Sequence, residues 1–312
     1  MLFFIIFAIE LLIPKTPTIE EGWEAIESWD SPLLTTQVFI KYGNLRMNKK
    51  TLACYTHFGS IEYQKTTIKN EIRVLSELNN FYSLFLIKYL GWNEGDTSIS
   101  IYTEGYNLLN SLTVDVVDIT TLMDFLLKTI KVLHDNNVVH GDIAISNIGY
   151  STDNGGYSIN TVESQIDLKL INFQHASIKE ELKATYSGDL NNAAPEVYEV
   201  LLSKAGQYNT KAADMYTVGV LLGQYYVYTN DISKTSIDIN KRIKSSNYNR
   251  FRLYKLYNCY SNRKMIFKKK NNNRNKMVAI IQGLTRCNPE KRVTIDQALE
   301  LFKQYRKDTA TN

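Results

Sequence analysis

The chain has few cysteines, and their placement excludes several kinds of protein. Its 312 residues include only three, Cys54, Cys259 and Cys287. An odd number of widely separated cysteines, with no zinc-ligand spacing, argues against a disulfide framework and against a cysteine metal site. We expect reduced thiols in a protein whose hydrophobic fraction of 44% suits a packed globular core.

The apolar run at the N-terminus is too short to cross a membrane as a helix. Met1–Ile13 is apolar except for Glu10, and about 20 residues are needed to span a bilayer. No Lys or Arg precedes the run, and no small-residue cleavage site is clear before Pro14. Three interpretations stay open: a targeting segment, a short membrane anchor, or a packed terminal extension. A cytoplasmic location is favoured, and secretion or membrane attachment requires that residues 1–14 act as a targeting segment.

Acidic residues are missing from one long segment. Residues 241–276 contain 13 Lys or Arg and no Asp or Glu, and the net charge of +4 therefore leaves the remaining chain at −9 (4 − 13). Aromatic residues interleave the positive charges: Tyr248, Phe251, Tyr254, Tyr257, Tyr260 and Phe267. Such a segment is either a solvated loop, as we expect for residues 268–276, or a contact surface for nucleic acid or another polyanion, for an acidic protein or for a membrane. Nothing in it points specifically to nucleic acid.

Two polar motifs, each delivered by an apolar run, carry the chemistry. Val138-Val139 leads into His140-Gly141-Asp142, and Asn147 follows five residues after Asp142. A second apolar run, Leu168–Ile171, leads into Asn172-Phe173-Gln174. These stretches resemble the catalytic loop H-R-D-x-x-x-x-N and the D-F-G turn of protein kinases. Asp142 and Asn172 are 30 residues apart, whereas kinases separate these two positions by roughly 18 residues. The additional residues fall in 151–164, which we interpret as an extended hairpin.

The resemblance implies a role for each motif residue. Asp142 is the predicted catalytic base that accepts the proton of the attacking hydroxyl, and His140 is predicted to be structural. Asn147 and Asn172 are the predicted magnesium ligands. Asn172 stands where the family has Asp, and an amide oxygen is a weaker ligand than a carboxylate for a hard cation. ATP and Mg²⁺ are therefore possible cofactors with weakened binding.

Other positions depart from the kinase pattern. Gly141 replaces the Arg that binds an activation-loop phosphate, and Gln174 replaces the last Gly of D-F-G. The glycine-rich phosphate loop is missing, since Gly43 is the only glycine between Gly22 and Gly59. The stretch Leu52-Ala53-Cys54-Tyr55 aligns best with V-A-I-K, which places Tyr55 at the position of the strand lysine. Lys49 or Lys50 is the alternative that would supply a displaced lysine.

Residues 37–110 predict a β-rich region with one helix. The strand candidates are Gln37–Lys41, Thr51–Phe58, Phe85–Gly91 and Ser98–Glu104. The apolar spacing in Thr67–Asn79 predicts a helix, in which Glu71 takes the place of the ion-pairing glutamate of the family. The resemblance also implies that an adenine base would contact the backbone around Thr103, Glu104 and Tyr106.

The second half predicts a helical region with structural kinase motifs. Apolar residues recur at helical spacing through Ile119–Asn137. Asp214 stands where the family has an Asp that caps amides of the catalytic loop. Glu196 of Ala194-Pro195-Glu196 and Arg292 of Asn288–Thr294 stand where the family has a buried ion pair, which we therefore predict.

The predicted fold class is α+β, a kinase-like bilobal fold with a small β-rich lobe and a larger helical lobe. The predicted division is an N-terminal extension at 1–34, the small lobe at 35–108, the large lobe at 109–306 with the basic insert 241–276, and a tail at 307–312. Three functions stay open. They are a pseudokinase or weakly active kinase with impaired nucleotide binding, an active Ser/Thr-type kinase, and a partner- or polyanion-binding module. A protein substrate or partner is expected, and a non-protein substrate stays open because the form His140-Gly141-Asp142 also resembles that of atypical and small-molecule kinases.

Overall fold

The chain divides into two units, each built from separate stretches of sequence. One comprises residues 1–108 and 149–174, and the other comprises residues 109–148 and 175–312. The fold is taken from a computed structural model, in which the described residues are 23–30, 34–41, 45–53, 61–81, 84–95, 98–109, 117–152, 166–179, 182–231 and 272–310. The sequence-based division assigned residues 149–174 to the large lobe, whereas the contacts group them with the first unit.

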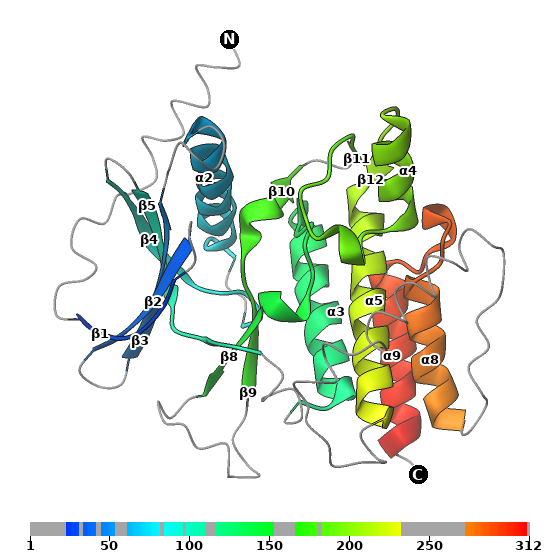
Figure 1. Ribbon diagram of the computed structural model, residues 1–312. Coiled ribbons are helices and arrows are strands. Elements are labelled where there is room, and N and C mark those ends of the chain that lie inside the picture. The colour runs from blue at the N-terminus through cyan, green and yellow to red at the C-terminus, as the bar shows by residue number, and fades with distance from the viewer. Residues whose placement is uncertain are drawn as a thin grey trace. The chain divides into compact units, whose positions relative to one another are not determined.

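An antiparallel sheet forms the main part of the first unit (Figure 1). Its strand order is β1 (Trp23–Asp30), β2 (Leu34–Lys41), β3 (Leu45–Ala53), β5 (Ser98–Glu104) and β4 (Tyr89–Glu94). In β3, Lys50 lies opposite Thr36 of β2 and Ile101 of β5. The central strand therefore presents its side chains between two neighbours, which fixes its register.

Two strands differ from their predicted positions. β1 lies within the predicted N-terminal extension and pairs with β2, so the sheet begins before residue 35. Its sequence carries charged residues at Glu24, Glu27 and Asp30, which hide the apolar alternation of a strand. β3 begins at Leu45 and ends at Ala53, whereas the prediction had Thr51–Phe58. The earlier strand end makes room for a helix that begins earlier than predicted.

The helix of the first unit is α2 (Ile61–Leu78), which begins six residues before the predicted Thr67. Ile68, Ile72, Leu75 and Leu78 are buried along one face, as their spacing predicts. A second, smaller sheet contains β6 (Asn107–Leu108), β8 (Ile148–Thr152) and β9 (Ile166–Leu170). The predicted hairpin between β8 and β9 lies outside the described residues.

The second unit is mainly helical. Its helices are α3 (Ile119–Asp135), α4 (Pro195–Ser203), α5 (Thr210–Asp231), α8 (Asn272–Leu284) and α9 (Ile295–Ala310). Helices α3 and α8 each pack against both α5 and α9, and these four lie side by side in Figure 1. Two small antiparallel pairs accompany them: β7 (Val138–Val139) with β10 (Ser177–Ile178), and β11 (Leu182–Lys183) with β12 (Tyr208–Asn209). The predicted α+β class, with one β-rich and one helical part, is confirmed.

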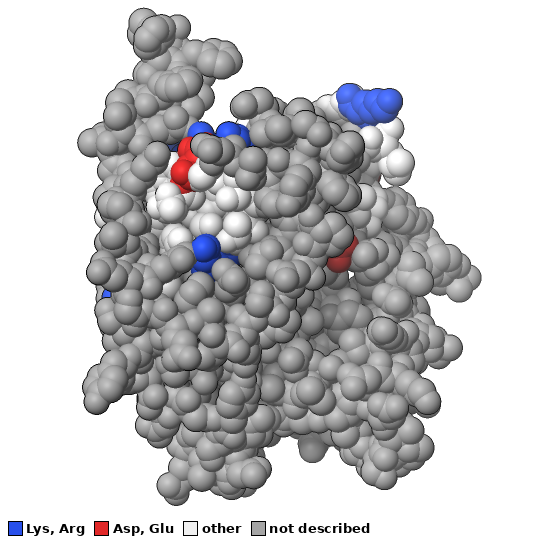
Figure 2. Space-filling view, turned by 60° about the vertical axis from the view of Figure 1, so that its left-hand side comes forward, with Lys and Arg blue, Asp and Glu red and all other residues white. Residues whose placement is uncertain are grey.

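Helices α8 and α9 extend into segments that were predicted to be a loop and a tail. Helix α8 begins at Asn272, so part of the predicted loop 268–276 is helical, and most of the basic segment lies outside the described residues. Helix α9 extends to Ala310, into the predicted tail. On the face drawn in Figure 2, the described charged residues are of both signs and do not merge into one patch. Among the described helices, none is both long and apolar enough to cross a membrane.

Candidate active site

Lys50 of β3 and Glu71 of α2 form an ion pair inside the first unit. Lys50 Nζ lies 2.7 Å from Glu71 Oε2. Glu71 is only 3% exposed, and its other carboxylate oxygen accepts a hydrogen bond from the Phe173 amide at 3.1 Å. Both oxygens of a buried carboxylate are thus satisfied, which a buried charge requires. Glu71 therefore has the ion-pairing position that the sequence predicted.

The partner of Glu71 corrects the sequence alignment. Tyr55 was placed at the lysine position, but Lys50 makes the pair and Tyr55 lies outside the described residues. The alignment failed because β3 ends at Ala53, so a register that needs a strand residue at 55 runs past the end of the strand. The signal available in the sequence was the cation itself, because Lys50 was one of the two nearby lysines considered as a substitute.

Asn172 joins this pair. Its Oδ1 accepts a hydrogen bond from Lys50 Nζ at 2.9 Å, just after the end of β9. The backbone of Asn172 has φ 65°, a left-handed conformation that Asn tolerates better than most residues. Nearby, the side chain of Asn70 donates to the Gln174 carbonyl at 3.3 Å. The turn after β9 is thus held against α2 by polar contacts.

These side chains do not form a carboxylate site for a magnesium ion. The Asn172 oxygen faces an ammonium group, and a cation placed there would have to displace Lys50 or lie beside it. Across the described ranges, no group of three or more His, Cys, Asp or Glu is arranged to hold a metal ion. Mg²⁺ prefers carboxylate and phosphate oxygens in octahedral geometry. Asn172 is therefore a poor replacement for the metal-binding aspartate of the D-F-G motif.

In the second unit, Asp214 holds the loop that carries the predicted base. Its Oδ2 and Oδ1 accept hydrogen bonds from the His140 and Gly141 amides, each at 2.9 Å, and Asp214 is 2% exposed. His140 is fully buried, and its Nδ1 accepts a hydrogen bond from the Asp142 amide at 3.2 Å. Both residues thus support the loop backbone, which is the structural arrangement that the resemblance implied.

The Asp142 carboxylate is oriented by two donors. Its Oδ1 accepts from the Asp189 amide at 2.8 Å, and its Oδ2 accepts from Asn147 Nδ2 at 2.9 Å. Asn147 Nδ2 also donates to the Asp142 carbonyl at 2.7 Å, and the residue lies in the 3₁₀ turn Ile145–Asn147. A general base must be held in one orientation to take a proton efficiently. The loop therefore brings together the predicted base and the predicted metal ligand Asn147.

The remaining predicted pair is present and buried. Arg292 contacts Glu196 through two hydrogen bonds, Nη1 to Oε1 at 2.6 Å and Nη2 to Oε2 at 2.9 Å. Nη1 also donates to the Ala212 carbonyl at 2.6 Å, and the guanidinium lies over the ring of Tyr216. A bidentate contact of this kind is a strong form of ion pair, and it connects α4 and α5 to the turn before α9.

The family comparison agrees with this geometry. A sequence model of the family described as "Protein kinase domain" matches residues 46–302. The chain belongs to the protein kinase family. A similar protein is a "Calcium/calmodulin-dependent protein kinase" of Metarhizium anisopliae, 28% identical over 171 residues, covering 51% of this chain and 41% of that protein. Another is "Serine/threonine-protein kinase PSK2" of Saccharomyces cerevisiae, 29% identical over 167 residues, covering 50% and 14%. The chain therefore matches less than half the length of either relative.

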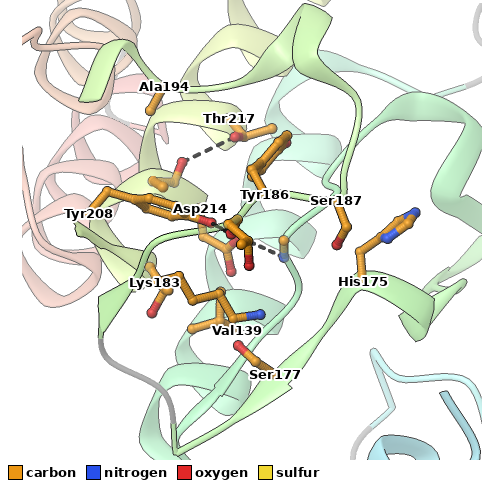
Figure 3. Close-up of a pocket in the computed structure, with 14 residues that line it drawn as sticks. Val139, His175, Ser177, Lys183, Tyr186, Ser187, Ala194, Tyr208, Asp214 and Thr217 are labelled. Carbon is orange, nitrogen blue, oxygen red and sulfur yellow. Dashed lines mark hydrogen bonds between the residues drawn. The ribbon is translucent and has the colours of Figure 1, made fainter. Parts of the chain in front are cut away.

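Gly141 of this kinase domain has no room for the arginine of H-R-D. Its φ of +75° favours glycine, and a Cβ there would lie 2.7 Å from the His175 carbonyl oxygen. Gly141 lines a pocket in the second unit together with Tyr186, Lys183, Tyr208 and other residues (Figure 3). Burial raises the pKa of the Tyr186 hydroxyl, and the nearby carboxylates of Asp142 and Asp214 raise it further. The tyrosine therefore stays neutral beside the catalytic loop.

The segment that precedes Asp189 is held by protein contacts. β11 pairs with β12, and the Tyr208 hydroxyl donates to the Thr185 carbonyl at 3.0 Å. The Tyr186 hydroxyl donates to the Asp189 carbonyl at 3.3 Å. These bonds keep the Asp189 amide in place as a donor to Asp142.

The residues that were predicted to contact the adenine base, Thr103, Glu104 and Tyr106, lie at the end of β5 and just after it. Glu104 has a structural role, because its Oε1 accepts from the Lys88 amide at 2.9 Å and pairs with Lys169 at 3.3 Å. Thr103 lies opposite Asn48 of β3 in the sheet, and the Tyr106 carbonyl accepts a hydrogen bond from Asn48 Nδ2 at 3.1 Å. Sequence reasoning missed Asn48, since a buried polar residue inside a strand has no signal in a hydrophobic pattern.

Proposed function

We propose that this kinase domain binds the phosphates of ATP through Lys50 and transfers phosphate only weakly, as a near-inactive Ser/Thr-type protein kinase. The observation that supports the proposal most strongly is the position of Lys50 Nζ, between Glu71 Oε2 at 2.7 Å and Asn172 Oδ1 at 2.9 Å. An oriented lysine is one of the few groups that phosphoryl transfer needs for charge neutralisation. With Lys50 in place, fewer catalytic groups are missing than the sequence suggested.

The second support is the retained base. Asp142 is oriented by Asn147 and by the Asp189 amide, so it is arranged to accept the proton of a substrate hydroxyl. The weak point is Asn172, because the family uses ATP with Mg²⁺ and this chain has an amide at the position of the carboxylate that would hold the ion. Loss of such an electrostatic contribution costs several kcal/mol at the transition state. We therefore propose a phosphoryl-transfer activity lower than that of a fully active kinase and greater than the zero activity of a scaffold protein.

The test is to restore the carboxylate. We expect Asn172→Asp to raise the rate of phosphate transfer from ATP to Ser/Thr peptides by about 10-fold or more in MgCl₂, because the ion gains a charged ligand. The measurement is transfer of radiolabelled γ-phosphate to a peptide library. The matched control is Asn172→Asp combined with Asp142→Asn, which should remove the gain.

Two outcomes would count against the proposal. A wild-type rate equal to that of Asn172→Asp would mean that Asn172 does not limit transfer. Absence of transfer by every variant, together with absence of any ATP-induced rise in melting temperature, would leave a scaffold without nucleotide chemistry. The partner- or polyanion-binding function of residues 241–276 remains a second proposal that rests on sequence.

A further inference from the structure

Residues of β3 define where a nucleotide base would lie in the first unit. Asn48 and Lys50 are two residues apart on one strand, so their side chains leave the same face of the sheet, about 7 Å apart along the strand. Lys50 is the proposed phosphate contact. Asn48 lies opposite Thr103, which begins the segment expected to contact the base. A nucleotide held at both places would therefore have its base beside Asn48.

Protein groups already fill that place. The side-chain amide nitrogen of Asn48 donates to the Tyr106 carbonyl at 3.1 Å. A carbonyl that could accept a hydrogen bond from the adenine base is therefore already bonded within the protein. The side chain of Tyr106 lies against Gly149 of β8: a Cβ on Gly149 would be 2.8 Å from Tyr106 Cδ2 and 3.1 Å from Cγ. The close approach depends on glycine, because any side chain at 149 would meet the ring.

Burial and two neighbouring side chains act on the Tyr106 hydroxyl. Burial raises its pKa to about 12, an interaction with the Asn48 side chain opposes the rise, and the negative charge of Glu71 adds to it. An effect of Glu71 on this hydroxyl requires that the two groups lie within electrostatic reach of each other. Glu71 is the ion-pair partner of Lys50, so the Tyr106 hydroxyl lies in the same part of the first unit as the proposed phosphate contact.

With Tyr106 in this position, the side-chain oxygen of Asn48 has no hydrogen-bond partner. Asn48 is 3% exposed, and its Oδ1 is buried without a hydrogen-bond partner. The reversed amide would place that oxygen against the Tyr106 carbonyl oxygen, so the orientation is fixed by its donor. An unpaired buried acceptor is unfavourable, and it lowers the cost of moving Tyr106 away. The ring is packed but displaceable.

We propose that Tyr106 is a specificity-determining residue that occupies the place of the nucleotide base, so that the wild-type site recognises the phosphates and not the base. The inference rests on the proposed binding of ATP phosphates at Lys50. It deepens that proposal by naming the ligand class, a triphosphate chain with no base requirement. Base contacts become available only in the fraction of molecules in which the ring has moved, which reduces the apparent affinity for ATP by that fraction.

The experiment compares ATP with inorganic tripolyphosphate by calorimetric titration of the full chain. We expect the wild type to bind the two ligands within about 3-fold of each other. We expect Tyr106→Ala to bind ATP at least about 10-fold more tightly than the wild type, with tripolyphosphate unchanged, if the open form is a minor state of 10% or less. Tyr106→Phe keeps the ring and should match the wild type.

A second variant reaches the same place from the other side. Gly149→Ala puts a methyl group where the Tyr106 ring lies, so it should also favour ATP over tripolyphosphate. Circular dichroism of each variant verifies the fold, and the wild-type comparison of the two ligands requires no variant. The inference is overturned if the wild type prefers ATP by 10-fold or more. It is also overturned if folded Tyr106→Ala does not gain ATP affinity.

The results that would refute phosphate binding at Lys50 differ from those that would refute only the role of Tyr106. If Lys50 does not hold phosphates, neither ligand binds to the wild type or to Tyr106→Ala, and Lys50→Met changes nothing. If only the inference is wrong, both ligands or ATP alone bind, Lys50→Met weakens that binding, and the Tyr106 variants leave the preference between the ligands unaltered.

Discussion

At the scale of single residues, the Arg292 side chain connects α4 and α5 to the turn before α9. Its side chain is 1% exposed, and it donates to Glu196 and to the carbonyls of Ala212 and Arg286. Removing one partner of such a pair leaves the other charge buried and unpaired, which is more costly than losing both. The stability effect of this pair should therefore depend on which residues are changed together.

We predict that Arg292→Met lowers the free energy of unfolding by about 3–5 kcal/mol, because Glu196 keeps its buried charge without a partner. The double variant Arg292→Met with Glu196→Leu should recover a large part of the loss. Denaturant unfolding followed by circular dichroism measures both. Lys128→Ala, which breaks the exposed pair with Asp124, is the control and should change stability little. Equal losses in the single and double variants would contradict the argument.

At the scale of elements, α3 has a well-formed N-terminal cap. Asp118 precedes the helix, and its carboxylate accepts from the amides of Thr120 and Thr121 at 2.7 and 3.0 Å. Partial burial raises the pKa of Asp118, but hydrogen bonds from Thr121 and Thr120 outweigh it and hold the pKa below its ordinary value. The ionised form is thus favoured in the folded protein, and α3 precedes the loop that carries the predicted base Asp142.

We predict that Asp118→Ala destabilises the protein by about 1 kcal/mol near neutral pH, since two helix amides lose their acceptor. Because the pKa of Asp118 is lowered on folding, its contribution is complete above the unfolded value of about 4 and is lost as pH falls through the folded value. The difference in melting temperature between wild type and variant should therefore shrink below about pH 4. A difference that is constant down to pH 2 would show that the carboxylate charge has no part in the cap.

At the scale of the whole molecule, charge is distributed unevenly along the chain. Residues 241–276 carry 13 positive and no negative side chains, while the rest of the protein is acidic overall. A dense positive segment attracts polyanions in a manner that salt weakens.

We predict that the full chain is retained on a heparin column, and that replacing Lys268, Lys269 and Lys270 with Glu lowers the salt concentration needed for elution. The replacement changes the local charge by six units, so weakened retention is expected if the segment makes the contact. The melting temperature should stay within about 2 °C of wild type, because the substitutions exchange charged side chains and remove no apolar group. Unchanged elution would place polyanion contact elsewhere or exclude it.

The sequence determined the elements that depend on local pattern. α3 is found at Ile119–Asp135 from its apolar spacing, and β5 at Ser98–Glu104 has the predicted bounds. The resemblance to the kinase motifs was also enough to predict the contacts of Asp214 and the Glu196–Arg292 pair, because the residues of these motifs are present in the order that the family has. β1 and the start of β3 were missed, since their charged residues interrupt the alternation that identifies a strand.

What the sequence by itself determined is the family, the α+β class and the residues available for chemistry. Only the tertiary structure decided which lysine meets Glu71, that Asn172 faces an ammonium group, and that Tyr106 lies against Gly149. The physical reason is that local spacing fixes helices and strands, whereas the register of the strands and the packing of the elements bring together residues distant in sequence, such as Lys50 and Asn172. A shift of a few residues in that register changes the partner of every side chain on the strand.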